Sequence, residues 1–133
     1  MDNLFLKLYL IALPIFFALD LLWLGIFAKK FYAKHLGSMM KTKVGWPAAI
    51  LFYLVYVAGL VALAIFPAVQ TDLLSNAFVS GAVFGACCYA TYDLTNLATL
   101  KGWPIALTVV DLLWGTLLTA SVSGVTYLIV LRW

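Results

Sequence analysis

Four long apolar stretches constrain the fold of this chain more than any other feature. They cover approximately residues 4–28, 47–67, 73–98 and 103–131. Each is long enough to cross about 30 Å of hydrocarbon as an α-helix rising 1.5 Å per residue. The chain is 66% hydrophobic and 10% charged, whereas a soluble domain carries about 25% charged residues. The sequence therefore predicts an all-α, polytopic membrane protein, with one membrane domain over residues 1–133 that forms a four-transmembrane-helix bundle.

Two short matches suggest that the bundle consists of two repeated helical hairpins. Gly45-Trp46-Pro47 begins the second stretch, and Gly102-Trp103-Pro104 begins the fourth. Trp suits the headgroup level, and Pro is tolerated in a first helical turn. Two repeated hairpins would have the same orientation in the membrane and would be related by a rotation axis along the membrane normal. Short matches also arise by chance in an apolar chain, so the duplication stays open.

The lysines predict the orientation of the chain in the membrane. The loop at residues 29–46 contains five of them, and Lys101 adds a sixth, against Lys7 and Arg132 at the other end. By the positive-inside rule, this basic loop is cytoplasmic and both termini are periplasmic. The first stretch has no A-x-A cleavage pattern, so we expect it to be retained. The net charge of +3 comes mostly from this loop, and we expect no nucleic-acid partner.

The densest run of hydrogen-bonding side chains lies in the third stretch, at residues 88–99. Five of these side chains fall within an arc of roughly 120° on one helix face: Tyr89, Tyr92, Asp93, Asn96 and Thr99. A polar stripe of this kind needs partners inside a bundle, because hydrocarbon offers none.

Three aspartates are predicted to lie in one layer within the membrane. Asp20, Asp93 and Asp111 each lie seven to nine residues from the cytoplasmic end of their stretch, or about 10–13 Å at 1.5 Å per residue. The stretches alternate in direction, so this agreement is not a trivial result of spacing. An Asp at the centre of a span costs about 2.5–3.5 kcal/mol on insertion scales. Without a basic partner in the spans, the three acids share a proton or bind a cation.

Two tryptophans accompany the acids. Trp23 follows Asp20 by three residues, and Trp114 follows Asp111 by three, so each Trp shares a helix face with its acid. The indole N–H can donate to a carboxylate, and the ring can present its face to an organic cation. A protonated Asp bonded to such a donor can also simply hold helices together.

Several kinds of chemistry find no support in the sequence. Cys87 and Cys88 are the only cysteines, and His35 is the only histidine, so no pattern for zinc, haem or an iron–sulfur cluster is present. We expect no cofactor and no metal, although an oxygen-ligand site on the three aspartates is chemically allowed. We expect the cysteines to pack as small apolar groups.

Small residues at four-residue spacing predict close helix packing. They recur on the third and fourth stretches: Ala77, Gly81 and Gly85, then Thr116, Ala120 and Gly124. We expect these stripes to pack within the bundle, with a dimer face as the alternative.

The motifs L-D-x-x-W-L-G, T-Y-D-L-T-N-x-A-T and D-x-x-W-G resemble those of the domain of unknown function 2177 family. The residues that carry the resemblance are Asp20, Trp23, Gly25, Tyr92, Asp93, Thr95, Asn96, Thr99, Asp111, Trp114 and Gly115. It covers essentially the whole chain. It implies a multi-pass protein of the bacterial inner membrane, with four spans and no established activity.

The first functional hypothesis is an intramembrane site on the cytoplasmic side that binds or processes a lipid-like or small amphiphilic molecule. Asp93 would be its central acid or base, flanked by Asp20 and Asp111. The ligand would contact Tyr89, Tyr92, Asn96, Thr99, Trp23 and Trp114. Whether the protein is an enzyme stays open.

Two further hypotheses belong to other classes. One is a small proton-coupled or organic-cation transporter, because the acids could alternate between proton and substrate. The other is a non-catalytic accessory subunit of a membrane complex. Membrane lipids are partners in every case, and a homo-oligomer or a larger membrane complex is compatible with the sequence.

Overall fold

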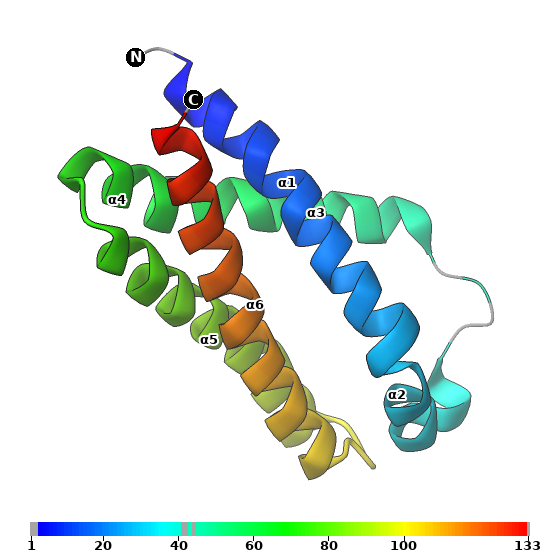
Figure 1. Cartoon of the computed structure of the whole chain (residues 1–133). Coiled ribbons are helices and arrows are strands. Elements are labelled where there is room, and N and C mark those ends of the chain that lie inside the picture. Colours follow the sequence, from blue (N-terminus) through cyan, green and yellow to red (C-terminus); the bar gives the residue numbers. More distant parts are fainter. Residues whose placement is uncertain (1–2, 41–42, 44, 133) are drawn as a thin grey trace.

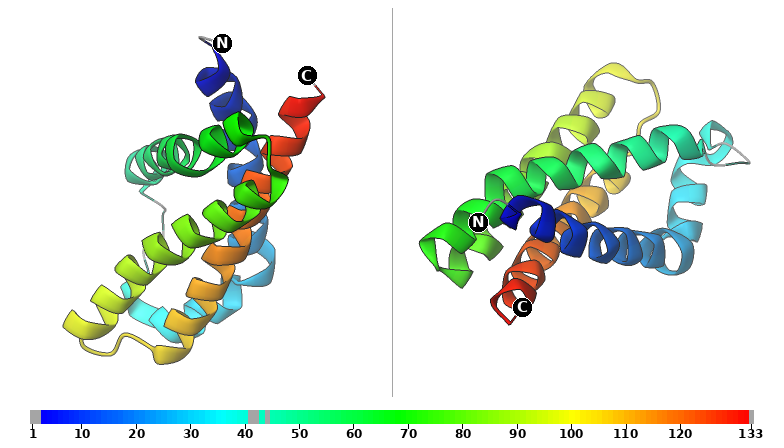
Figure 2. Two further views of the ribbon diagram at one scale, coloured as in Figure 1. Left: turned by 90° about the vertical axis from the view of Figure 1, so that its left-hand side faces the viewer. Right: turned by 90° about the horizontal axis from the view of Figure 1, so that it is seen from above.

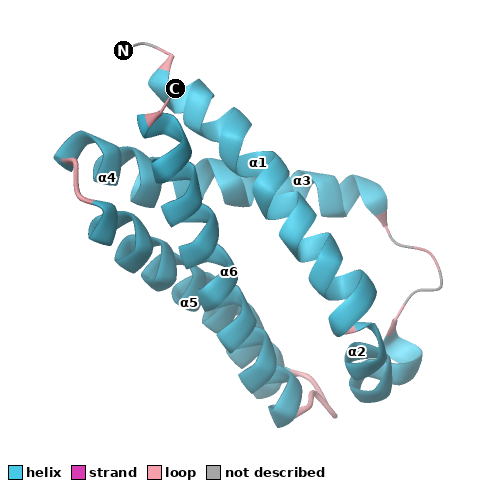
Figure 3. Cartoon of the chain, in the orientation of Figure 1, coloured by secondary structure: helices cyan, strands magenta, loops and turns pink. Residues whose placement is uncertain are grey.

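Helices make up nearly all of the described chain (Figure 3). The structure is a computed structural model that describes residues 3–40, 43 and 45–132. Within these residues, four helical segments are long and apolar enough to cross a membrane: Leu4–Phe27, Trp46–Thr71, Leu74–Thr99 and Ile105–Leu131. The predicted all-α fold with four membrane-spanning helices is confirmed.

The first two of these segments each contain a wider π-helical turn. The first consists of α1 (Leu4–Leu22) and the turn η1 (Trp23–Phe27). The second consists of α3 (Trp46–Leu60), the turn η3 (Val61–Ile65) and α4 (Phe66–Thr71). The other two are single helices, α5 (Leu74–Thr99) and α6 (Ile105–Leu131).

The basic loop predicted at residues 29–46 contains a helix, which the sequence analysis did not anticipate. It holds α2 (Lys29–Leu36), followed by the short 3₁₀ turn η2 (Gly37–Met39). Tyr32 is buried here together with Ala28, and Leu36 packs against the same cluster. These residues follow each other at intervals of four, so they form one apolar helix face, while the lysines lie exposed. Lys41, which we counted in this loop, lies outside the described residues.

The second stretch, predicted to end near residue 67, extends further, because the helix continues through Pro67 as α4. Pro67 has no N–H for the carbonyl of Leu63, and the π-helical turn η3 comes directly before it. A widened turn accommodates such a lost bond. The chain reverses only at Asp72, which adopts a left-handed conformation with φ of 57°. Asp tolerates this conformation better than most residues.

The four segments do not form a simple parallel array. Helices α5 and α6 run side by side, and α1 packs on α6 (Figures 1 and 2). The second segment crosses them at a steep angle and contacts α1, α5 and α6 together through η3. The first half of α3 therefore diverges from α5 and α6. Both termini lie at one end of the molecule, and α2 lies at the other with the α5–α6 connection (Figure 1).

Small residues make the close contact between α5 and α6 possible. Gly81 and Gly85 are buried, and a Cβ on Gly85 would lie 2.5 Å from the carbonyl oxygen of Gly115 and 2.6 Å from the Thr119 hydroxyl. The stripe on α5 is thus covered by α6 of the same chain. Close approach of this kind is what holds helices together where water supplies no hydrophobic force between them.

Replacing Gly85 by Ala should therefore destabilise the protein by about 1–3 kcal/mol, the usual cost of forcing extra volume into a packed core. The measurement is the free energy of unfolding in detergent micelles. Gly25→Ala is the matched control, because a Cβ there meets nothing within 4 Å. Equal stability of the two variants would contradict the role given to Gly85.

Candidate functional site

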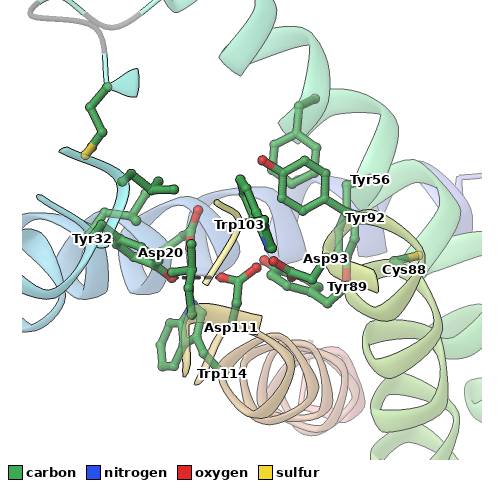
Figure 4. A pocket seen from close by; sticks show the side chains of 15 residues that line it. Asp20, Tyr32, Tyr56, Cys88, Tyr89, Tyr92, Asp93, Trp103, Asp111 and Trp114 are labelled. Carbon is green, nitrogen blue, oxygen red and sulfur yellow. Dashed lines mark hydrogen bonds between the residues drawn. The ribbon is translucent and has the colours of Figure 1, made fainter. Parts of the chain in front are cut away.

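A cavity of about 600 Å³ lies where α3 diverges from α5 and α6. Six helical elements contribute side chains to its lining: α1, η1, α2, α3, α5 and α6 (Figure 4). Met40 and Trp103, which lie outside these helices, complete it. The lining residues are Asp20, Leu24, Tyr32, Leu36, Met40, Phe52, Tyr56, Cys88, Tyr89, Tyr92, Asp93, Trp103, Leu107, Asp111 and Trp114. Most of this wall is aliphatic or aromatic, and its most polar members are the three carboxyl groups.

The three predicted acids do come together. Asp20 reaches the cavity from α1, Asp93 from α5 and Asp111 from α6. They are not equivalent, however. Asp93 has no exposed surface and Asp20 is only 5% exposed, whereas Asp111 is partly exposed. Asp111 is therefore the acid that a molecule in the cavity would meet most directly.

Asp20 is held by one donor on each of its carboxyl oxygens. The Tyr53 hydroxyl donates to Oδ2 at 2.7 Å, and the Trp114 indole N–H donates to Oδ1 at 3.3 Å. These donors come from α3 and α6, so the Asp20 carboxyl joins three helices. A buried acid with both oxygens bonded is well suited to a structural role.

Asp111 is bound through a residue of the amphipathic helix α2. The Tyr32 hydroxyl donates to Asp111 Oδ1 at 2.8 Å and accepts a hydrogen bond from the Trp23 indole N–H at 3.2 Å. Burial raises the pKa of the Tyr32 hydroxyl above its ordinary value, so this group remains a donor at neutral pH. The pair of bonds fixes α2 over one end of the cavity.

The tryptophans donate to side chains of neighbouring helices and not to the acid of their own helix. Trp114 donates to Asp20 on the neighbouring helix and not to Asp111, while Trp23 reaches Asp111 only through Tyr32. Their rings stack between α1 and α6 with centroids 4.4 Å apart and an interplanar angle of 9°. A spacing of three residues places each Trp and its Asp on the same face of one helix. The indole is nevertheless long enough to reach a side chain on the neighbouring helix. An indole N–H does donate to an intramembrane carboxyl group, as the sequence allowed, but the acid belongs to the neighbouring helix.

Asp93 has a different environment from the other two acids. Within the described residues, neither of its oxygens receives a hydrogen bond from an N–H or O–H donor. The carboxyl group of Asp111 lies next to it in the wall of the cavity (Figure 4). Two carboxyl groups so close together repel each other when both are ionised, which favours a proton on one of them. The fully buried Asp93 is the natural holder of that proton, since burial without a donor disfavours a charge.

Three predicted aromatic residues line the cavity: Tyr89, Tyr92 and Trp114. The Tyr89 ring lies directly on Gly115, where a Cβ would come within 2.2 Å of it. Tyr92 makes an edge contact with Trp103, with ring centroids 6.0 Å apart. Gly115 thus leaves the space that brings Tyr89 to the wall of the cavity.

Three predicted contact residues do not line the cavity. Thr99 is the last residue of α5, and its hydroxyl donates to the Thr95 carbonyl. Asn96 lies one turn beyond Tyr92, and α5 carries both Asn96 and Thr99 past the end of the cavity. Trp23 lies behind Tyr32 and Trp114, so it supports the wall without forming it.

Sequence reasoning missed three tyrosines that belong to the site. Tyr32 and Tyr53 donate to the acids, and Tyr56 lines the cavity while its hydroxyl bonds to Thr119 at 2.9 Å. Tyr53 and Tyr56 lie seven and ten residues after Trp46, so they lie at the depth predicted for the aspartates. A search for hydroxyl groups as well as carboxyl groups at this distance from the cytoplasmic end of each stretch would have identified them.

Within the described residues, no group of three His, Cys, Asp or Glu side chains lies close enough to hold a metal ion. His35 contacts the Phe31 carbonyl through Nδ1 at 2.9 Å and does not line the cavity. Cys88 lines the cavity as a free thiol, and its neighbour Cys87 is exposed elsewhere. The arrangement therefore offers hydrogen bonding and proton exchange by carboxyl groups.

Comparison with known proteins gives one match. The model of a family described as "Predicted membrane protein (DUF2177)" matches residues 5–128. The chain matches none of the curated proteins and none of the solved structures at a significant level. The family description gives a membrane location and no activity.

Tyr32→Phe should loosen α2, because it removes both the donor to Asp111 and the acceptor for Trp23. We expect faster amide hydrogen exchange in α2 and a loss of about 1–3 kcal/mol of stability, since one of the lost bonds goes to an acidic group. Tyr9→Phe is the control, because among the described residues its hydroxyl bonds only to the Leu54 carbonyl, at an exposed position. Unchanged exchange in α2 of the Tyr32 variant would contradict this role.

Proposed function

The chain belongs to the DUF2177 family of predicted membrane proteins, and from this premise we propose that it binds a small amphiphilic, lipid-like molecule within the membrane. The cavity that carries this proposal measures about 600 Å³, within the range of about 300–1,000 Å³ typical of small-molecule sites. A largely apolar wall with a few convergent polar groups is the usual composition of such sites.

The distribution of polar groups in the cavity supports an amphiphile in preference to a wholly apolar ligand. Leu24, Leu36, Met40 and Phe52 supply apolar wall, while Asp111 supplies a partly exposed carboxyl group. An apolar tail would lie against the first group, and a polar head would reach the second. A ligand with no polar group would leave Asp111 without a partner for its second oxygen, which is costly in a site that excludes water.

The proposed position in the membrane follows from the lysines. Lys29, Lys30 and Lys34 lie on α2, at the end of the molecule that also carries Lys101. By the positive-inside rule, this end faces the cytoplasm of a bacterial inner membrane and both termini face the periplasm. The cavity then belongs to the cytoplasmic half of the bilayer, and an amphiphile could enter it from the adjoining lipid leaflet.

A specific contact also favours a second function, proton-coupled transport. The Asp93 and Asp111 carboxyl groups lie next to each other in the cavity wall (Figure 4), and such a pair can release and take up one proton as a bound cation arrives and leaves. Protein-dependent acidification of liposomes on addition of an amphiphilic cation would favour transport. Binding without any proton movement would favour a binding protein.

The cysteine pair provides a direct test of the binding proposal. Cys88→Phe places a ring in the cavity, whereas Cys87→Phe places the same ring on an exposed neighbouring position. We expect native mass spectrometry of the protein in mild detergent to detect a defined copurifying molecule in the wild type and in the Cys87 variant. The Cys88 variant should lose it, because the added ring occupies the same volume.

A heterogeneous mixture of bulk phospholipid on all three proteins would contradict the proposal. Thermal unfolding of each variant controls for misfolding, so that loss of the molecule from a folded Cys88 variant counts as evidence.

A further inference from the structure

We infer that the head group of the ligand is a protonated amine and that it binds against Asp111. This inference rests on the proposed binding function and specifies the chemical class of its ligand. It starts from a feature that the packing of the protein does not explain. Asp111 keeps one carboxyl oxygen for which no donor from the described residues is found, next to a fully buried acid.

The described wall of the cavity contains carboxyl groups and no compensating positive charge. None of its fifteen residues is a lysine, an arginine or a histidine. Asp20 already has a donor on each oxygen. The lysines of α2 are exposed and do not line the cavity. No described residue brings a positive charge to this site, and a bound cation would supply one.

Asp93 explains why Asp111 can keep a negative charge at this depth. Asp93 has no exposed surface, and within the described residues neither of its oxygens has a hydrogen-bond partner. A protonated Asp93 carries no charge that would repel Asp111, and Tyr32 donates to Asp111 at 2.8 Å. This donor stabilises a carboxylate, and the Asp111 oxygen without a described donor is available to whatever fills the cavity. Asp93 is thus a positioning residue, and Asp111 is the residue that contacts the ligand.

Aromatic rings surround this carboxyl group. Tyr89, Tyr92 and Trp103 all line the cavity near Asp111 (Figure 4). Ring faces attract cations, most strongly where water is excluded. The combination of one carboxylate with several rings favours an ammonium group over an alcohol. It disfavours a carboxylate or phosphate head, which would face acids. The two indole N–H groups of the described wall already donate to Thr108 and Asp20.

Three probes with the same twelve-carbon chain separate the head groups: dodecylamine, dodecanol and dodecanoate. Occupancy is read from the rate at which N-ethylmaleimide alkylates Cys88 in a Cys87→Ala protein, because Cys88 lines the cavity. We expect dodecylamine to protect Cys88 at a concentration at least about tenfold below that of dodecanol, since a charged hydrogen bond is stronger than a neutral one. Dodecanoate should protect least. A Cys88→Ala protein, which retains the exposed Cys87, should show no protection.

Two conservative variants test the roles of the acids separately. Asp111→Asn should abolish the preference for dodecylamine and leave the affinity for dodecanol within about twofold, because the charge is lost and the shape is kept. Asp93→Asn should retain the preference, because the amide, like a protonated acid, carries no charge and keeps the shape of the side chain. Retained dodecanol binding also shows that each variant has folded.

The outcomes distinguish this inference from the binding proposal on which it rests. Equal protection by amine and alcohol, or strongest protection by dodecanoate, would overturn the inference and leave the binding proposal standing. If no probe protects Cys88 and no molecule copurifies with the wild type, the binding proposal itself fails. Vesicles of phosphatidylcholine with and without phosphatidylethanolamine identify the source: competition by phosphatidylethanolamine assigns the amine to a bilayer lipid, and its absence assigns it to a free amphiphilic amine.

Discussion

The structure depends on the requirement that polar groups in hydrocarbon find their partners inside the protein. The clearest instance is the connection between α1 and α6. Trp114 of α6 donates to Asp20 of α1, while Trp23 of η1 is linked through Tyr32 to Asp111 of α6. The two indole rings stack between these bonds. Because no water competes inside the membrane, this crossed set fixes both helices and, through Tyr32, the position of α2.

The cavity exists because one helical segment does not follow the other three. Helices α5 and α6 approach closely through Gly81, Gly85 and Gly115, whereas the second segment crosses them and contacts them at η3. The divergence of α3 leaves a space that α2 partly covers. Tight packing at one place and divergence at another thus give a stable bundle that still has room for a ligand. The carboxyl groups, which need partners inside the protein, line this cavity.

Much of the site could be predicted from the sequence by arguments of depth and helix face. The three aspartates were found in this way, and so were Tyr89, Tyr92 and Trp114. The same arguments failed for Asn96 and Thr99, because a helix face continues along α5 beyond the end of the cavity. They missed Tyr32, whose segment was taken for a loop. An interval of four residues between Ala28, Tyr32 and Leu36 was the available sign of an amphipathic helix.

The sequence by itself determined the apolar solvent and the number of membrane-spanning helices, because these follow from apolar length. Counting residues along each helix predicted a common depth for the acids. Only the tertiary structure decided which donor meets which acid. It alone placed Asp93 out of reach of every N–H and O–H donor in the described chain and beside Asp111. The physical reason is that side-chain partners depend on helix crossing angles and on π-helical turns such as η1 and η3. These arise from the packing of all segments together, which no single stretch of sequence encodes.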